Sequence, residues 1–585
     1  MSVDGWGVSS VDPTQPQHSP LEFALTTTQT YTTVTQDFQV MPSSWPPNLP
    51  NPEVTRHLVH AFFAFFVHAG RLFHGPTFLA LLDLSPTDPR FPSAATLHTI
   101  CAVGSMFTAD IAPTPVHTGQ GFPYEIFTGR WRRRAVRPDS FAEQQIAFAK
   151  VEIESNIELG ERLFEGVQAQ VLVTWFFLHQ GRWAECFISA GLALRYASAC
   201  GLSKEEPFKP KPPRKALLLK AGKHGDLLPE PQTHTEEEVR RNVFWLAYAM
   251  ERAASSGSSY AMELDDNDIC QLLPLRGDYF DLGKHVPLEE RQFSHARNVL
   301  LQNPPGQTDS FILYIKSLML MSRIKSFNLR YRGRHYAGET EFYPAVSSPD
   351  GESGTYDVRQ SPRFRELEQL VCQFRESWPP HLKDPIQDGV VDPHLYAACV
   401  ISHLAPILLH DSHMSLDSPM DVSVVVSYKA TREILDLIYA ISSTSYDVSL
   451  LDQAALLGWD KACRNLIEFL RVAINTNNFE QVFSLHSEIC FIHAMMAKAG
   501  ERMPVAYRYK KVIYDTLAQH CGEQFVEPLP ETSYHRPGYV APGESAYADP
   551  APSMASLVNN LLTYDGFSAP KEAIGPMTAS TSCVF

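Results

Sequence analysis

Apolar residues recur along most of this chain at the three- and four-residue intervals of an amphipathic helix. In the stretch EEEVRRNVFWLAYAMERAASS, residues 236–256, such intervals join Val239, Val243, Leu246 and Met250. No alternating run is long enough to predict a β-sheet, and no repeat of fixed length is visible. We therefore predict an all-α fold, a large multi-helix domain of packed antiparallel helices.

Polar residues and glycines mark the predicted ends of several helices. The expected N-caps, whose side chains accept a hydrogen bond from a free backbone amide, are Asn51, Ser93, Asp139 or Ser140, and Thr235. Gly70 is expected to end the first helix, and Gly201 to take a left-handed C-cap conformation. The stretch 165–203 is expected to form two helices joined at Gly181-Arg182-Trp183.

The same periodicity continues through the second half of the chain. It predicts further helices at about 288–301, 308–332, 362–377, 392–411, 422–443, 450–475, 478–499 and 503–520. Pro- and Gly-rich segments predict exposed loops at about 203–235 and 333–360. Residues 1–50 and 526–585 are rich in Pro and polar residues, and we predict that both are disordered tails flanking one domain over residues 51–525.

Charge and cysteine usage narrow the function classes. Of 585 residues, 49 are Lys or Arg and 65 are Asp or Glu, which gives a net charge of −16 and disfavours nucleic-acid binding over the whole surface. The ten cysteines form no CxxC pair, which argues against a zinc knuckle and a disulfide framework and fits an intracellular protein. No signal peptide is evident, and the apolar runs are too short for a membrane span. We therefore expect a soluble protein without a membrane partner.

Four segments, taken in order, resemble the regulatory middle homology domain of fungal binuclear-zinc-cluster transcription factors. They are RLFHGPTFLALL, DPRFPSAATLHTICAVGS, VQAQVLVTWFFLHQGRWAECFISAGLALRYASACGLS and EEEVRRNVFWLAYAMERAASSGSSYAMELDDNDICQLLP, which together cover roughly residues 53–275. The matching motif residues are His74, Pro76, Phe78, Gly191, Arg195, Gly201, Arg240, Arg241, Phe244, Trp245 and Arg252. We expect these residues to be scaffold, with Arg240, Arg241 and Arg252 paired to nearby acids and helix ends.

The resemblance implies a nuclear regulator of RNA polymerase II genes that is not an enzyme. The implied partners are the transcription machinery or another regulator, and a small-molecule effector and a homodimer remain open. The family's DNA reader, a six-cysteine cluster that binds two zinc ions, is absent, because the first 100 residues contain no cysteine. Zinc and direct DNA binding are therefore implied only through an upstream module. The alternatives are a cluster-less protein acting on a DNA-binding partner and a helical biosynthetic enzyme.

Two departures from the family pattern occur at the end of the last motif. Glu251-Arg252 stands where the family has Asp-Arg, and Gly257-Ser258-Ser259 stands where it has Gly-Arg-Pro. Beyond the family motifs, the sequence offers no phosphate loop, nucleophile elbow or zinc-protease motif. A catalytic function thus has no positive support.

Histidines and basic runs offer weaker candidates. Cys399, His403, His410 and His413 fall on one helical face, but the outer two would lie ~20 Å apart, so a helix-packing face is favoured over a shared metal ion. The same interpretation applies to His57, His60 and His68. The run at 130–137, RWRRRAVR, could contact phosphates, but a solvated helix start paired with Glu143 or Glu152 is favoured slightly.

Two segments outside the predicted helices could serve transport or activation. KPKPPRK in a predicted loop resembles a nuclear import signal through Lys209, Lys211, Arg214 and Lys215. Near the C-terminus, SMASLVNNLLTYDGF places Leu557, Leu561 and Tyr564 on one face beside Asp565. This segment could fold onto a coactivator or could dock on the domain, and the sequence favours neither.

Overall fold

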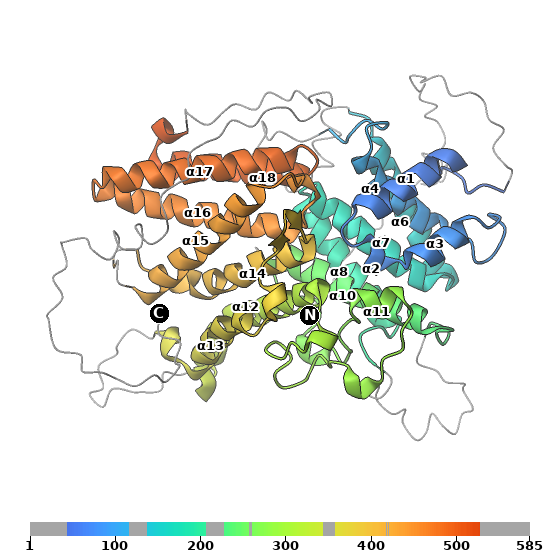
Figure 1. The fold of residues 1–585 in the computed structure, drawn as a ribbon, viewed down its shortest axis with the longest axis horizontal. Coiled ribbons are helices and arrows are strands. Elements are labelled where there is room, and N and C mark those ends of the chain that lie inside the picture. Colours follow the sequence, from blue (N-terminus) through green and yellow to red (C-terminus); the bar gives the residue numbers. More distant parts are fainter. Residues whose placement is uncertain are drawn as a thin grey trace, which may run out of the picture. The chain divides into compact units, whose positions relative to one another are not determined.

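The structure is a computed structural model, and it describes residues 44–115, 137–205, 227–256, 260–342, 357–416, 418 and 421–526. The chain divides into two units, Met1–Trp45 and Pro46–Phe585, and the account below concerns the second. Figure 1 shows that helices make up nearly all of its regular structure. The prediction of an all-α fold is confirmed. The predicted tails lie for the most part outside the described residues.

The first half of the described chain forms a group of helices around α4 and α7. In order the helices are α1 (Pro52–Phe65), α2 (Ala69–Leu72), α3 (Gly75–Leu82), α4 (Ala94–Gly104), α6 (Phe141–Leu159), α7 (Leu163–His179), α8 (Trp183–Ala199) and α10 (His234–Ser256). α7 is buried on every side from Gly166 to His179. That burial explains why its apolar residues surround the helix instead of forming a stripe.

The crossing of α1 and α4 is close because Gly104 has no side chain. A Cβ atom at Gly104 would overlap the carbonyl oxygen of Leu58 on α1 and would lie 3.0 Å from the carbonyl carbon. Backbone atoms inside a packed helix cannot move aside as a flexible side chain can. Any larger residue at this position would therefore push the two helices apart.

The second half stacks long helices one beside the next, as Figure 1 shows for α12, α14, α15 and α16. The helices are α11 (Gly277–Asp281), α12 (Ser310–Tyr336), α13 (Pro362–Glu376), α14 (Pro393–His410), α15 (Val422–Ser442), α16 (Gln453–Asn475), α17 (Phe479–Gly500) and α18 (Pro504–Cys521). Between α13 and α14 a short antiparallel hairpin pairs β1 (Ile386–Gln387) with β2 (Val390–Val391). α14 packs against α12, α13, α15 and α16 and so lies at the centre of this stack.

Short 3-10 turns join these elements. They are η2 (Ser105–Phe107), η4 (Asp266–Asp268), η5 (Leu288–Glu290), η6 (Pro305–Gln307), η7 (Thr340–Phe342), η8 (Val358–Gln360), η9 (Pro380–Leu382), η10 (Asp411–His413), η11 (Val448–Leu450) and η12 (Glu523–Phe525). Most of them sit where a loop meets a long helix, the usual place for such turns.

Among the described residues one helix is long and apolar enough to cross a membrane. It is α14 with its extension, Pro393–His413, and 72% of an 18-residue apolar window within it is buried inside the protein. Burial by neighbouring helices accounts for its apolar composition without a lipid environment.

Three of the predicted caps are confirmed and one is wrong. The side chains of Asn51, Ser93 and Ser140 each accept a hydrogen bond from the amide three residues on, at 2.8, 3.2 and 3.3 Å. Thr235 does not cap α10. The helix begins one residue earlier, and Thr233 accepts from the amide of Glu236 at 3.1 Å.

The predicted end of the first helix at Gly70 is also wrong. α1 stops at Phe65, and Gly70 lies inside the short α2. The break falls at residues 66–68 because His68 leaves the helical path and enters a buried hydrogen-bonded group with His394 and Asp452. Gly201 does take the expected left-handed conformation, with φ of 78° after α8.

The predicted helix at 288–301 does not form beyond the short turn η5. Instead this stretch pairs with the segment that follows α10: Leu273 donates its amide to Gln292 O at 2.8 Å, and Ser294 donates to Gln271 O at 3.0 Å. Tertiary pairing overrides the local helical pattern here. The predicted loop at 333–360 likewise begins later, because α12 continues to Tyr336.

Candidate functional site

The N-terminal half of α10 carries a buried group of charged side chains. Arg241, only 3% exposed, donates to Glu238 and to Glu205 and Glu237 at 2.8 and 3.1 Å. Arg291 approaches Glu238 from another side at 2.8 Å. Burial, followed by the charge of Arg241, lowers the pKa of Arg291 to about 9. These contacts fasten the chain before and after α10 onto the helix.

A second buried group lies at the C-terminal end of α10. The guanidinium of Arg252 is 1% exposed and pairs with Glu251 and, at 2.9 Å, with Asp266. It also donates to Ser322 Oγ on α12 at 2.9 Å and lies 4.3 Å from the ring centroid of Tyr248. Arg252 therefore joins three elements: α10, the turn η4 and α12.

A third buried group joins the two halves of the described chain. His68, at the N-terminus of α2, has Nδ1 3.1 Å from His394 Nε2 and Nε2 2.8 Å from Asp452 Oδ2. Tyr314 on α12 donates to Asp452 Oδ1 at 3.4 Å, and its ring lies beside both imidazoles. Asp452 also caps α16 by accepting from the amide of Ala454 at 2.8 Å.

The two imidazoles of this third group connect His394 to the carboxylate of Asp452 through hydrogen bonds. Burial, together with the charges of His68 and Arg71, holds the pKa of His394 well below its usual range, so this ring is neutral. Whichever imidazole donates in the 3.1 Å contact between His394 and His68, the Nε2–H of His68 donates to Asp452 Oδ2. Every nitrogen on this path then has a partner, and α2, α14 and α16 are held together by one chain of hydrogen bonds.

The remaining motif residues of α10 serve packing. Trp245 donates from its indole nitrogen to Leu272 O at 2.7 Å, and its ring meets that of Phe244 edge-on. Arg240 pairs with Glu236 at 2.6 Å and donates to Pro229 O at 2.7 Å. Together with Arg241 and Arg252, these contacts place the predicted arginines against acids and backbone carbonyls within the domain.

The motif residues on α3 and α8 also make internal contacts. His74 precedes α3 and bonds Thr77 Oγ1 at 2.6 Å, Pro76 occupies the first turn, and Phe78 is buried. On α8, Arg195 pairs with Glu263, and a Cβ atom at Gly191 would lie 3.5 Å from that same carboxylate. The segment that follows α10 thus lies against α8 as well.

The histidines of the 399–413 row face different surroundings. His403 bonds Arg375, whereas His413 contacts the rings of Tyr331 and Phe364. Burial raises the pKa of the Cys399 thiol to about 12. Among the described residues no group of three His, Cys, Asp or Glu side chains could hold a metal ion. Helix packing therefore accounts for this row, as it does for buried His68, whereas His57 and His60 are exposed.

His410 should make the stability of the protein pH-dependent. Burial, then the charges of His413 and Arg359, lowers its pKa to about 4, and Nδ1 lies 3.0 Å from Ser423 Oγ. Below about pH 6.5 the unfolded chain binds a proton at this position, whereas the folded chain does not until about pH 4. The free energy of unfolding therefore decreases as the pH is lowered, by up to about 1.4 kcal/mol per pH unit. His410→Gln should remove one proton's share of that slope between pH 6.5 and 4, measured by urea unfolding at several pH values. An unchanged slope would contradict this assignment.

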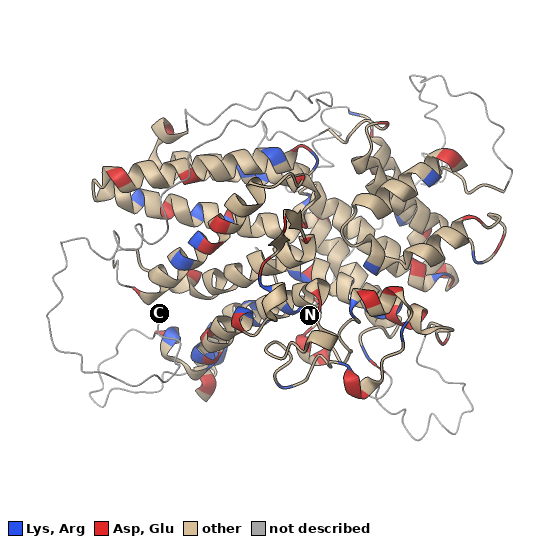
Figure 2. Cartoon of the chain, in the orientation of Figure 1, with Lys and Arg blue, Asp and Glu red and all other residues tan. Residues whose placement is uncertain are grey.

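The basic segments lie mostly outside the described residues. Arg137, the last residue of the run at 130–137, pairs with Glu143 through two 2.9 Å hydrogen bonds, as favoured from the sequence. The rest of that run, the Lys209–Lys215 segment, Gly257-Ser258-Ser259 and the C-terminal Leu557–Asp565 segment are not described. Figure 2 shows that the positions of acidic and basic residues alternate along the described helices without a large region of one sign.

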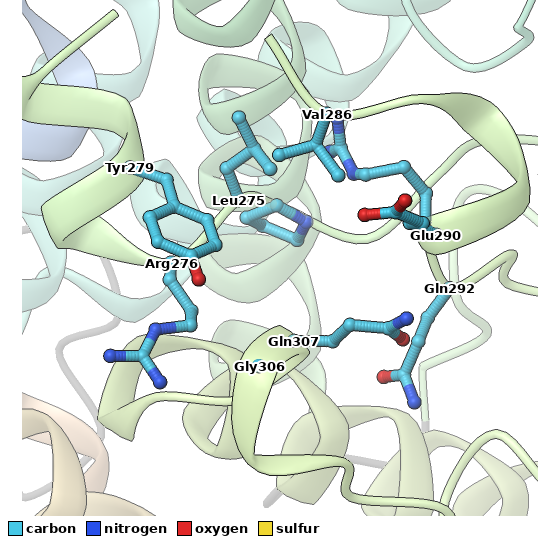
Figure 3. Close-up of a pocket in the computed structure, with 10 residues that line it drawn as sticks. Leu275, Arg276, Tyr279, Val286, Glu290, Gln292, Gly306 and Gln307 are labelled. Carbon is cyan, nitrogen blue, oxygen red and sulfur yellow. The ribbon is translucent and has the colours of Figure 1, made fainter. Parts of the chain in front are cut away.

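A pocket beside α11 is lined by polar and apolar residues in about equal measure. Figure 3 shows Tyr279 and Arg276 on one side and Glu290 and Gln292 on the other, with Gln307 below. Its empty volume is about 260 Å³, including open solvent. Sites for drug-sized ligands span ~300–1,000 Å³. This pocket is therefore smaller than a typical site for such an effector.

Sequence reasoning missed the partners in all three buried groups. His394 lies 326 residues from His68, Asp452 lies 384 residues from it, and Arg291 lies 53 residues from Glu238. No local pattern marks these residues. The weak signal available was the presence of polar residues at predicted cap or core positions.

These buried groups hold helices to one another and to the segments that flank α10. The chain is thus a large helical domain whose signature residues make internal contacts. Residues 59–338 match the fungal specific transcription factor domain. The match begins within α1 and ends just after α12, so α13 to α18 lie beyond it.

A curated relative agrees with the family. The chain is 22% identical over 277 residues to the Zn(2)-C6 fungal-type transcription factor FTF1c of Fusarium oxysporum f. sp. lycopersici, an alignment that covers 46% of this chain and 24% of the relative. The chain therefore spans about a quarter of the length of that relative. No solved structure matches the chain.

The residues described do not fit the zinc cluster that the relative's name implies. The described cysteines are dispersed over the helices and the segments between them, most of them buried. A binuclear cluster needs six thiolates close together, and the first cysteine of the sequence is Cys101, inside α4. The described residues therefore offer no set of ligands for such a cluster.

Proposed function

We propose that this chain is a fungal transcription regulator that controls RNA polymerase II genes from the nucleus. The single observation that carries the proposal is the family match over residues 59–338, the region that also contains the buried arginine groups. The regulator acts by contact and not by catalysis. Its partners are the transcription machinery or another regulator, and its DNA contact comes from a six-cysteine module outside this sequence or from a DNA-binding partner.

The buried polar groups support a mechanism of regulation by alternative packing. Buried polar groups of this kind stabilise one arrangement of the helices. When a helix shifts, their hydrogen bonds break together, so two discrete packing arrangements are favoured over a continuous range of them. His68, His394 and Asp452 form such a joint between the matched part of the chain and the helices after it. A partner or effector that binds one state better would shift the population towards it.

A reporter experiment tests the proposal. The full chain, fused to a foreign DNA-binding module, should change output from a promoter carrying that module's site, relative to the module alone. The variant Arg252→Ala should lose the effect, because it removes a buried joint, whereas Arg330→Ala, at the 45% exposed guanidinium paired with Asp265, should keep it. Unchanged output with the full chain would refute the proposed function.

A further inference from the structure

α17 exposes two large aromatic side chains at its N-terminal end. Phe479 and Phe483 are 80% and 79% exposed, one helical turn apart. The next residues on the same side of the helix, at intervals of three and four, are His486 and Cys490. Two adjacent exposed phenylalanines on a helix that is otherwise packed on its inner side are the mark of a surface that binds something apolar.

The C-terminal end of the described chain already covers part of this side of α17. The ring of Phe525 lies 5.4 Å from that of His486, and the Phe525 carbonyl accepts from His486 Nε2 at 2.7 Å. Val526, the last described residue, is buried. The chain therefore leaves the domain beside the exposed pair, with residues 527–585 still to follow.

We propose that residues 554–566, MASLVNNLLTYDG, dock as an amphipathic helix on Phe479 and Phe483. In that segment Met554, Leu557, Leu561 and Tyr564 recur at intervals of three, four and three. Leu557, Leu561 and Tyr564 have the same spacing as Phe479, Phe483 and His486, so two helices laid side by side can interdigitate these side chains. The docked segment extends the cover that Phe525 begins.

The length of the connecting chain makes this intramolecular contact favourable. Thirty residues, 527–556, separate Val526 from Leu557, whereas His486 and Phe479 are only ~10 Å apart along a helix at 1.5 Å per residue. A tether of this kind gives an effective concentration on the order of millimolar. An affinity too weak for a separate partner therefore suffices here. The docking does not depend on the proposed function. If the chain is a regulator, the docked domain covers the apolar and acidic segment 554–566.

Hydrogen–deuterium exchange on the purified full chain tests the docking. Amides of residues 556–566 should exchange at least tenfold more slowly than those of residues 540–550, and Phe479→Ser/Phe483→Ser should abolish the protection. Leu557→Asp/Leu561→Asp should abolish it too, whereas Val558→Asp, which lies off the apolar face, should leave the segment docked. Both phenylalanines are exposed, so their replacement should not unfold α17.

The control on the domain side is Ile188→Ser/Leu192→Ser, an exposed apolar pair with the same spacing on α8, which should not alter the protection. Absence of protection in the wild-type chain overturns the proposal, as does protection that survives Phe479→Ser/Phe483→Ser. Protection that appears only with rising protein concentration, together with a dimeric mass by light scattering, overturns it in favour of a second copy. None of these measurements involves DNA or transcription, so their outcome is independent of the outcome of the reporter experiment.

Discussion

Arg252→Ala is expected to lower the free energy of unfolding by about 3 to 5 kcal/mol, the range measured when one partner of a buried ion pair is removed. The substitution leaves Glu251 buried with its charge unpaired, and it takes away the donor to Ser322 and the cation beside Tyr248. Asp266 also loses a partner. Urea unfolding followed by circular dichroism measures the change.

The matched control for this variant is Arg330→Ala. Arg330 pairs with Asp265, next to Asp266, but its side chain is exposed (45%) and that of Asp265 is only half-buried (34% exposed). An exposed pair of this kind contributes about 0 to 1 kcal/mol. If the two variants lost stability equally, burial would not be the reason for the effect of Arg252.

Asp452→Ala is expected to lower the free energy of unfolding by about 1.5 to 5 kcal/mol, from an N-cap loss of about 0.5 to 2 kcal/mol and an unsatisfied buried donor of about 1 to 3 kcal/mol. The carboxylate caps α16 through the amide of Ala454 and accepts from His68 in the buried group. The same unfolding experiment applies. Because His68 and Asp452 come from opposite halves of the described chain, the variant should also be cleaved faster by a protease at sites between residues 68 and 452.

A cap without a buried partner provides the comparison. Asn478→Ala removes the 3.2 Å hydrogen bond that its Oδ1 accepts from the amide of Gln481 at the start of α17, and the 3.3 Å one that its Nδ2 donates to the Gln481 side chain. Its loss should stay within the about 0.5 to 2 kcal/mol of a cap alone. An Asp452→Ala variant no less stable than Asn478→Ala would mean that the contact with His68 adds nothing.

Local signals in the sequence were sufficient for the fold class and for most helix boundaries. Asn51, Ser93 and Ser140 cap helices as predicted because capping involves atoms only three residues apart. The order of family motifs correctly indicated the transcription factor domain. Where the local pattern failed, at residues 288–301, strand-like pairing with residues 271–273 replaced the helix.

The buried joints could not be predicted in the same way. Arg241 and Arg252 were expected to pair with acids, but the sequence did not identify Glu205, Arg291 or Asp266 as members of their groups. Such partners are chosen by the final packing of helices, which brings together residues tens to hundreds of positions apart. A histidine at a helix break, such as His68, looks the same in sequence whether it faces water or a buried carboxylate.

The position of the histidine joint bears on how this protein can be divided and recombined. A fragment ending at residue 338, where the family match stops, would keep His68 and Tyr314 but lose His394 and Asp452. It would also uncover the side of α12 that α14 packs against. The unit that gene fusion or recombination can transfer intact is therefore larger than the region of detectable family resemblance, and it reaches at least through α16.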